Sequence, residues 1–308
     1  MRSEATEGTN VDVFGLIGNP VGHSLSPPMH EAAYRELDMD ARYVTFEPAP
    51  GDLADTISGA RALGITGLNV TIPFKCDVLD LCEPDDLAAR IGATNTLDFR
   101  SVAEGSSAVE EPTANGDTLT RPQGCNTDAI GARRALEDSG VDLEGRAVVV
   151  GAGGAGRAIS FALADAGMDV TVANRTAETA RELAASLSED ATADTDVDAS
   201  ANGTSDGHGL DALPALLADA DLLVNATSVG MDEDRSPVPR EALHGDLAVF
   251  DAVYRPIETR LLCEARAAGA RTIDGATMLL HQGAAAFERW TGRSPPLNVM
   301  DEALRARL

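Results

Sequence analysis

The chain contains 308 residues, enough for two domains, and 44% of them are hydrophobic but only 4% aromatic, so we expect aliphatic cores. Its formal net charge of −26 excludes nucleic acid and anionic membranes as partners, because both are bound by basic surfaces. No apolar run approaches the ~18 residues of a membrane helix, and the spacing of Cys and His residues predicts no metal site.

The excess of acidic residues also indicates that the protein works at high salt concentration. Lysine occurs once, and this composition resembles that of proteins from salt-loving organisms, where molar salt shortens the screening length to about 3 Å and weakens self-repulsion. An acidic enzyme from a low-salt organism is the alternative. Residues 1–10 are polar and acidic, unlike a signal peptide, so we expect a soluble, cytoplasmic protein with reduced cysteines.

Strands alternate with helices in the first half of the chain, which predicts βαβ units and a largely parallel sheet. Residues 100–123 lack periodicity and are rich in Ser, Glu, Gly, Thr and Pro, which predicts a surface insertion, either flexible or a loose hairpin. The expected strands are 11–17, 42–47, 68–72 and 93–97, and the expected helices are 26–37, 53–63, 73–82 and one ending near residue 139.

The stretch 68–75 reads as a strand followed closely by an ammonium group. Side chains alternate in a strand, so Asn69 and Thr71 share one face while the apolar residues at 68, 70 and 72 face a core. Pro73 ends the strand. Lys75 follows, and lysine, unlike arginine, can give up its proton when its surroundings permit. The alternative is a half-exposed edge strand with an ordinary surface lysine.

The loop 18–27 is rich in glycine and proline and carries two serines on either side of a leucine. The hydroxyls of Ser24 and Ser26 can therefore point the same way. Ser26 before Pro27 also suits a helix start, as N-cap and first helical residue. The serines are therefore candidates both for ligand binding and for helix capping.

Asp128 and Gln282 also have two interpretations each. Asp128 falls in the first turn of a helix that Asn126 or Thr127 would cap, where a carboxylate suits the helix dipole. Gln282 lies beside the apolar stripe of a helix that begins near residue 274, and is either a satisfied core amide or a ligand contact.

The second half of the chain contains a G-x-G-x-x-G sequence at 151–156, after an apolar strand at 146–150 and before a helix that ends near residue 166. This context is the one that binds the pyrophosphate of a dinucleotide, through a tight turn and free amides at a helix start. Further strands are expected at 170–173, 221–225 and 249–252, and an acidic run at 188–209 reads as solvated charge.

The end of the 170–173 strand discriminates between cofactors. An NAD enzyme usually has Asp or Glu here for the ribose hydroxyls, whereas this chain has Asn174, Arg175 and Thr176. A guanidinium and hydroxyls attract a 2′-phosphate that a carboxylate would repel. The sequence therefore predicts NADP rather than NAD.

Together these motifs resemble the shikimate dehydrogenase family, and the resemblance covers nearly the whole chain outside the two acidic insertions. No single motif would be specific, but the set is. The matching stretches are 18–27, 69–75, 95–96, 126–128, 151–156, 174–176, 225–228, residue 254 and 278–290.

The resemblance implies a reversible, NADPH-dependent reduction of 3-dehydroshikimate to shikimate in aromatic amino-acid biosynthesis. It assigns Lys75 and Asp128 as the catalytic pair. Lys75 would donate a proton to the carbonyl oxygen as hydride arrives, and Asp128 would orient the ammonium and hold a ring hydroxyl.

Further site residues are carried over by position. The resemblance implies that the substrate contacts are Ser24, Ser26, Asn69, Thr71, Lys75, Asn95, Asp128, Tyr254 and Gln282. It implies that the NADP contacts are Gly151, Ala152, Gly153, Gly154, Ala155, Asn174, Arg175, Thr176, Thr227, Ser228, Val253, Gly275 and Met278.

The family fold implies two α/β domains with the active site in the cleft between them. A substrate domain with a mainly parallel sheet would comprise 1–127 and 275–308, and a Rossmann-type NADP domain would comprise 128–274. Three alternatives remain: a quinate/shikimate dehydrogenase, a different Rossmann reductase, and a non-catalytic NADP-sensing module. The oligomeric state is open, with a homodimer as one option.

The charge balance makes stability depend on salt. Dialysis of the purified chain from molar to low salt should lower its melting temperature, because weaker screening strengthens repulsion among the carboxylates. A melting temperature that does not change with salt would contradict the halophilic interpretation.

Overall fold

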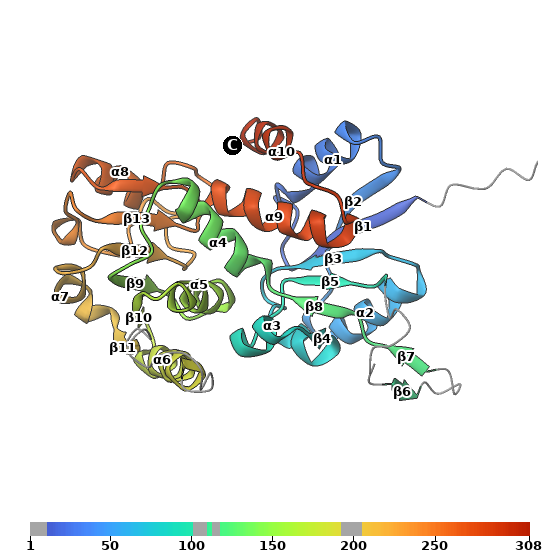
Figure 1. Cartoon of the computed structure of the whole chain (residues 1–308), viewed down its shortest axis with the longest axis horizontal. Helices are drawn as coiled ribbons and strands as arrows, with labels where there is room; N and C mark the ends of the chain where they lie inside the picture. Colours follow the sequence, from blue (N-terminus) through green and yellow to red (C-terminus); the bar gives the residue numbers. More distant parts are fainter. Residues whose placement is uncertain (1–10, 101–109, 113–117, 192–204) are drawn as a thin grey trace, which may run out of the picture.

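The structure is a computed structural model that describes residues 11–100, 110–112, 118–191 and 205–308. Within these residues the chain forms two α/β domains, each built around a six-stranded sheet (Figure 1). Helices α4 (Thr127–Asp138) and α9 (Gly275–Thr291) run between the two sheets and pack against each other. The fold therefore agrees with the two-domain α/β expectation.

The first sheet is mixed rather than purely parallel. Strand β1 pairs in parallel with β2 and β3, whereas β5 runs antiparallel to β3 and β8. In sheet order the strands are β2 (Ala41–Phe46), β1 (Asp12–Ile17), β3 (Gly67–Val70), β5 (Thr96–Asp98), β8 (Gln123–Cys125) and β4 (Glu83–Pro84).

Both faces of this sheet are covered. On one face, Phe14 of β1 stacks on Trp290 of α9 with ring centroids 5.1 Å apart, in a core shared with α1 and α10. On the other, Leu68 and Val70 of β3 pack with residues of α2 and of the 3₁₀ helix η2. The helices that contribute to these two cores, besides α9, are α1 (Ser26–Glu36), α2 (Leu53–Ala62), η2 (Asp77–Leu81) and α10 (Leu297–Arg305). The same part of the chain also contains η1 (Pro50–Asp52) and α3 (Asp86–Ile91).

The second sheet is parallel throughout. Its order is β11 (Ser205–Gly209), β10 (Asp169–Asn174), β9 (Arg146–Val150), β12 (Leu222–Asn225), β13 (Ala248–Asp251) and β14 (Arg271–Ile273).

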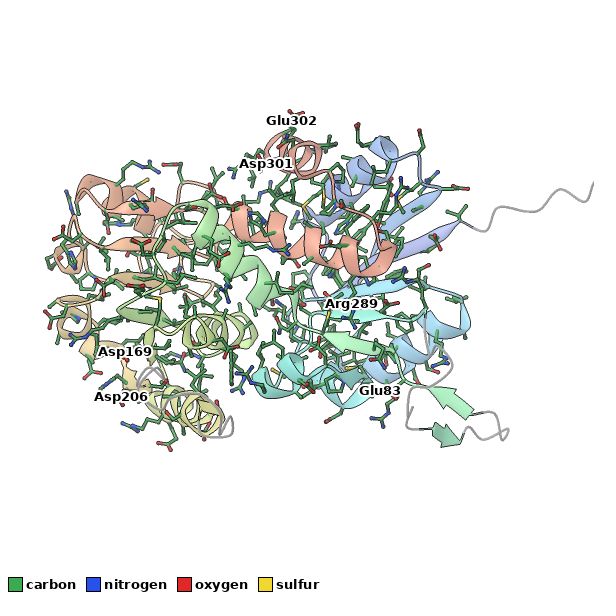
Figure 2. The ribbon with its side chains drawn as sticks, viewed as in Figure 1. Glu83, Asp169, Asp206, Arg289, Asp301 and Glu302 are labelled. Atoms are coloured by element: carbon green, nitrogen blue, oxygen red, sulfur yellow. The ribbon has the colours of Figure 1, made fainter. Side chains whose placement is uncertain are left out.

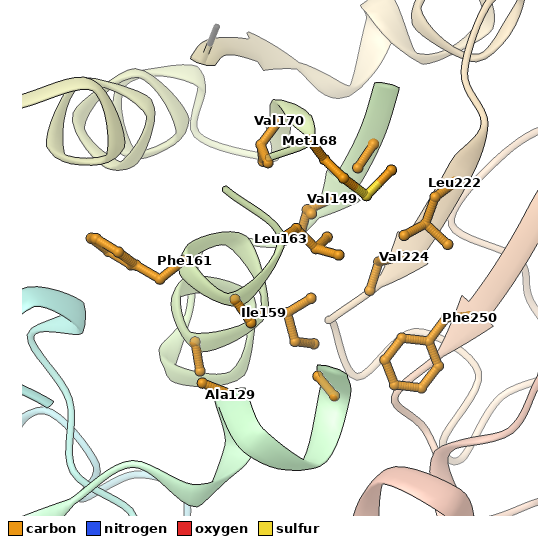
Figure 3. Close-up of a cluster of buried hydrophobic side chains, with 14 of the residues drawn as sticks. Ala129, Val149, Ile159, Phe161, Leu163, Met168, Val170, Leu222, Val224 and Phe250 are labelled. Atoms are coloured by element: carbon orange, nitrogen blue, oxygen red, sulfur yellow. The ribbon is translucent and has the colours of Figure 1, made fainter. Parts of the chain in front are cut away.

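Alternate valines of β9 enter different cores, as the strand period requires. Val149 packs under α4, α5 (Gly154–Asp165) and α6 (Ala177–Ala191), in the cluster that Figure 3 shows together with Phe250. Val148 packs on the other face with α7 (Leu213–Leu217), α8 (Arg260–Ala267) and residues near η3 (Leu210–Ala212) and η4 (Arg240–Ala242). The order of the strands and the two covered faces are those of a doubly wound, dinucleotide-binding sheet.

The prediction of a helix at residues 73–82 is wrong. Turns follow β3, and only Asp77–Leu81 is helical, as η2. The carbonyl oxygen of Lys75 accepts a hydrogen bond from the amide of Thr94, at 2.8 Å, and is therefore unavailable to a helical ladder. A tertiary contact thus replaces the local preference.

Two smaller expectations also fail nearby. Ile72 does not face the core but is 67% exposed, because β3 ends at Val70 and the chain turns there. Ser26 is not the N-cap but the first residue of α1, whose N-cap is Leu25.

The described parts of the two insertions contain regular structure. In the first, β6 (Glu110–Pro112) pairs antiparallel with β7 (Thr118–Thr120), which is the hairpin alternative. In the second, residues 205–209 form the edge strand β11, so this end of the acidic run is part of the sheet rather than only solvated charge. The rest of both segments lies outside the described residues.

Among the described residues, no helix combines the length and the apolar character that crossing a bilayer requires. The same ranges contain no group of three or more His, Cys, Asp or Glu side chains arranged to hold a metal ion.

Gly67 should be essential to the first core, because a Cβ there would lie 2.6 Å from Cε2 of Trp290. Gly67→Ala should displace the indole, weaken its 2.9 Å hydrogen bond to the carbonyl of Leu97, and cost about 1–3 kcal/mol of unfolding free energy. Denaturant unfolding followed by the emission of Trp290, the only tryptophan, measures this.

Gly59→Ala is the matched control, since a Cβ at this position in α2 meets no atom within 4 Å. It should stabilise the protein by about 0.5–1 kcal/mol. Equal effects of the two substitutions would contradict the packing argument.

Candidate active site

The centre of the candidate site is an ion pair between Lys75 and Asp128. Nζ of Lys75 lies 2.6 Å from Oδ2 of Asp128, and the two side chains are only 15% and 7% exposed. Asp128 is held in the first turn of α4, where the side chain of Asn126 accepts hydrogen bonds from the amides of Asp128 and Ala129. A short, mostly buried pair of this kind is a strong charge-assisted hydrogen bond.

Lys75 also lies beside the glycine loop of the second domain. A Cβ built on Gly154 would lie 3.2 Å from Cδ of Lys75, so the lysine stem passes close to the loop backbone. Two segments about 80 residues apart in sequence thus meet at one point, and the ammonium lies beside the place where the sequence predicts a dinucleotide.

A buried polar network adjoins this pair. Oδ1 of Asn95 accepts hydrogen bonds from the amide of Thr127 at 2.7 Å, from its hydroxyl at 3.2 Å and from the hydroxyl of Thr96 at 3.1 Å. The Thr127 hydroxyl also lies 3.5 Å from Oε1 of Gln282. Thr127 therefore links Asn95 to Gln282 next to Asp128.

Asn69 is bonded on every polar atom. The hydroxyl of Tyr43 donates to its Oδ1 at 2.7 Å, and its Nδ2 donates to Oγ1 of Thr96 at 3.0 Å and to the carbonyl of Asn95 at 3.4 Å. Both donors of its side-chain amide and one lone pair of its Oδ1 are used by the protein, so Asn69 acts as a support for Asn95 and Thr96.

The serine loop lies against the end of β3. The amide of Asn19 donates to the carbonyl of Ile72 at 3.0 Å, and a Cβ on Gly18 would overlap the side chain of Thr71. The hydroxyl of Ser24 accepts from the amide of Ser26 at 3.2 Å. This loop is therefore fixed next to Thr71.

Tyr254 lies just after β13 and packs against the core that contains Leu25. Burial raises the pKa of its phenol, with Arg255 acting in the opposite direction, so Tyr254 is a neutral hydrogen-bonding group at physiological pH.

The glycine loop has the shape that a pyrophosphate requires. Gly151 has φ +111°, a conformation that side chains rarely adopt, and a Cβ there would lie 2.9 Å from Thr227. A Cβ on Gly153 would meet nothing within 4 Å, so the space in front of the α5 N-terminus is open. Its N-cap makes no side-chain hydrogen bond, which leaves the first amides of α5 free for an anion. Ala152 and Ala155 complete the loop.

The predicted 2′-phosphate contacts lie at the carboxyl end of β10. Arg175 and Thr176 are exposed there, and Nδ2 of the Asn174 side chain donates to the carbonyl of Thr176 at 3.2 Å, which holds the turn. Among the described residues, the guanidinium of Arg175 has no hydrogen bond or ion pair, so it is free to meet a ligand.

The loops after β12 and β13 are joined by the buried carboxylate of Asp251. Its Oδ1 accepts from Asn225 at 2.9 Å and from the amide of Val253 at 3.0 Å, and its Oδ2 accepts from Thr259 at 2.7 Å. Asn225 in turn accepts from Thr227. Burial raises the pKa of Asp251, although these donors oppose the shift.

Three predicted cofactor residues remain. Ser228 is exposed after β12, whereas Gly275 and Met278 are buried in the first turn of α9. Gly275 packs directly on the backbone of the β13 loop, where a Cβ would lie 2.5 Å from the carbonyl oxygen of Ala252.

Three family models match the chain in succession. They are the shikimate dehydrogenase substrate binding domain over residues 16–97, shikimate/quinate 5-dehydrogenase over 135–231, and the shikimate 5'-dehydrogenase C-terminal domain over 275–305. A shikimate dehydrogenase (NADP(+)) of Haloarcula marismortui is 58% identical over 298 residues, covering 97% of this chain and all of the relative. The chain belongs to the shikimate dehydrogenase family.

Other similar proteins agree. A shikimate dehydrogenase (NADP(+)) of Halorubrum lacusprofundi is 59% identical over 300 residues, covering 97% of this chain and all of the relative. The crystal structure of shikimate 5-dehydrogenase from Thermus thermophilus in complex with NADP(H) and shikimate has a TM-score of 0.79 and 37% identity, and covers 96% of this chain and all of the other. The halophilic character of the composition also fits these relatives.

The structure adds three polar residues to the site of this shikimate dehydrogenase family member. The sequence did not identify them as site residues. Tyr43 orients Asn69, and Thr96 and Thr127 join the amides of the network. Thr96 and Thr127 lie inside motifs that match the family, next to Asn95 and Asp128 in the sequence, and this adjacency could have identified them. Tyr43 lies on a different strand, and nothing in the sequence near it indicated a role in the site.

The free guanidinium at the end of β10 should set cofactor preference. Arg175→Ala should raise the apparent KM for NADP far more than that for NAD, because only NADP presents a 2′-phosphate to this position. Arg181→Ala, which removes an exposed arginine paired with Glu178 on α6, is the control and should change neither value. Equal increases for NADP and NAD in Arg175→Ala would refute the assignment.

Proposed function

We propose that this chain is a shikimate dehydrogenase that reversibly reduces 3-dehydroshikimate to shikimate with NADPH, in the biosynthesis of aromatic amino acids. The observation that supports this most directly is the 2.6 Å pair of Lys75 and Asp128 beside the glycine loop. A proton donor is thereby held next to the expected cofactor, as reduction of a ketone requires.

Lys75 acts as the general acid. When bound, NADPH supplies the hydride that adds to the carbonyl carbon. The ammonium of Lys75 donates one hydrogen bond to Asp128 and keeps two N–H groups for the substrate, so it can transfer a proton to the carbonyl oxygen. In the reverse direction the neutral amine takes the proton from the hydroxyl.

Asp128 has two roles in this proposal. Its Oδ2 accepts a hydrogen bond from the ammonium of Lys75 at 2.6 Å and holds it in place. Its Oδ1 makes no hydrogen bond within the described part of the chain, and accepts one from a ring hydroxyl. The carboxylate thus aligns the acid with the carbonyl that is reduced.

The remaining substrate contacts surround this pair. Nδ2 of Asn95 makes no hydrogen bond to the described residues, although its Oδ1 is fully used, so the amide is held with its donors free for a ring hydroxyl. Gln282 and Thr71 make similar contacts. Ser24, Ser26 and Tyr254 bind the carboxylate through neutral hydroxyls, and Asn69 supports the network. A site of many paired polar groups discriminates against analogues that lack a hydroxyl.

NADP is the cofactor. In the proposal its pyrophosphate lies on the loop 151–155, and its 2′-phosphate meets Asn174, Arg175 and Thr176. The nicotinamide side is formed by Thr227, Ser228, Val253, Gly275 and Met278, whose loops are joined through Asp251.

The domain boundaries are part of the proposal. We assign 1–127 and 275–308 to the substrate domain and 128–274 to the NADP domain. The apolar residues of α4 pack in the core of the second sheet, which supports a boundary just before Asp128. The first turn of α9 begins at Gly275, directly after β14 of the second sheet, and the rest of the helix packs in the first-domain core.

Two alternatives make distinct predictions. A quinate/shikimate dehydrogenase of the same fold would oxidise quinate as well, and Arg175 argues against the NAD preference expected of such an enzyme. A sensor would bind NADP and shikimate without turnover. We also propose a cytoplasmic location without nucleic-acid partners, consistent with four free cysteines and the acidic charge, and a homodimer as the assembly to test.

Lys75→Ala should lower kcat for shikimate oxidation by about 10²–10⁴, because a positioned acid or base contributes this much. Lys75→Arg should not restore the rate, since a guanidinium does not give up its proton. NADPH formation from shikimate and NADP measures both.

Cys76→Ser is the matched control, since this neighbouring thiol is exposed and outside the proposed site. It should keep the wild-type rate. A wild-type rate in Lys75→Ala would contradict the proposed role of Lys75. If the wild-type protein bound shikimate but formed no NADPH, the result would favour the non-catalytic sensor.

A further inference from the structure

A cavity of about 670 Å³ lies beside the serine loop, and neither Lys75 nor Asp128 is among its lining residues. Residues of the loop and of α1 form one wall, and Ala303 of α10 with the two residues Ala306 and Arg307 just after this helix forms another. Arg255, directly after Tyr254, completes it. The volume is within the range of small-molecule sites, roughly 300–1,000 Å³.

Three guanidiniums line this cavity, against one carboxylate. They belong to Arg35, Arg255 and Arg307, and the carboxylate belongs to Glu31. Glu31 is already compensated, because its Oε1 accepts from the amide of Tyr43 at 2.7 Å and its Oε2 lies 4.0 Å from Nη1 of Arg35.

Arg255 and Arg307 are left without such compensation. Within the described ranges, neither side chain has a hydrogen bond or ion pair. Other arginines of the same region do: Arg305 on α10 contacts Asp301 and Asp274 at 2.8 and 3.2 Å. Asp301 and Glu302, labelled on α10 in Figure 2, are not among the residues that line the cavity.

The overall charge makes this arrangement informative. The chain has 50 acidic and 24 basic residues, so a cavity lined by three guanidiniums and one carboxylate has the opposite charge balance to the chain as a whole. In molar salt, charges act on a ligand only at contact range, because screening extends about 3 Å. Two guanidiniums without a carboxylate partner line one cavity, where they can contact an anion directly. The paired N–H donors of each guanidinium suit the geometry of a carboxylate or a phosphate.

We propose that this cavity binds a small polyanion with at least two carboxylate or phosphate groups, held by Arg255 and Arg307. Ser24 lines both this cavity and the proposed carboxylate site for shikimate, so an occupant competes with the substrate. This second statement rests on the proposed function, whereas binding itself does not.

Equilibrium dialysis of the full chain against labelled pyrophosphate or citrate, at constant molar KCl, tests the binding. Saturating NADP is present so that the glycine loop is already occupied and contributes no second phosphate site. We expect saturable binding of one anion per chain, weakened about tenfold or more in Arg255→Gln/Arg307→Gln, because two charge-assisted contacts are lost. Tighter binding of one probe identifies the preferred anionic group.

Arg134→Gln/Arg240→Gln is the matched control, since it removes the same charge from exposed positions on α4 and η4, outside the cavity. It should bind like the wild type. Absence of saturable binding, or equal weakening in both double variants, would overturn the proposal, the latter because it would show only a net-charge effect.

Steady-state kinetics test the regulation. The anion that binds should raise the apparent KM for shikimate but not for NADP, and Arg255→Gln/Arg307→Gln should abolish this inhibition. Inhibition that is competitive with NADP but not with shikimate would overturn the proposed competition with shikimate. It would place the anion on the glycine loop instead. If the wild type showed no turnover, the proposed function would fail while the dialysis result still decided the binding.

Discussion

The salt bridge between Lys75 and Asp128 is the constraint on which the site depends. It joins the turn after β3 to the start of α4, and the stem of Lys75 lies close to Gly154 of the other domain. Removing two charges from water is costly unless they pair closely and are further hydrogen-bonded. The cap at Asn126 and the fixed turn after β3 meet that condition by bringing the two groups to 2.6 Å.

The polar residues around this pair form a connected network. Tyr43 orients Asn69, Asn69 binds Thr96, and Thr127 connects Asn95 with Gln282. Most acceptors in this network are used by the protein, and free donors such as Nδ2 of Asn95 remain. Because a buried polar network tolerates few arrangements, it specifies both the local fold and the hydroxyl pattern of a ligand. The second sheet contributes the open glycine loop and the loops joined at Asp251.

The sequence predicted most elements whose periodicity is undisturbed, such as the strand at Arg146–Val150 and the helix that Asn126 caps. It failed where tertiary contacts compete with local preference. Residues 73–82 do not form the expected helix because the Lys75 carbonyl bonds to Thr94. The strand at residues 205–209 was hidden in an acidic run, because it lies at the sheet edge and needs no apolar signature.

By itself, the sequence determined the family, the cofactor class and the candidate catalytic lysine, since glycine spacing, an arginine at a strand end and a single lysine are local features. Only the tertiary structure decided that Lys75 meets Asp128 and the glycine loop, that Tyr43 supports the site, and that Arg255 and Arg307 share a cavity. The reason is physical. Hydrogen bonds and charge pairs act over a few ångströms, and which distant segments come within that range is set by how the two sheets and the helices between them pack.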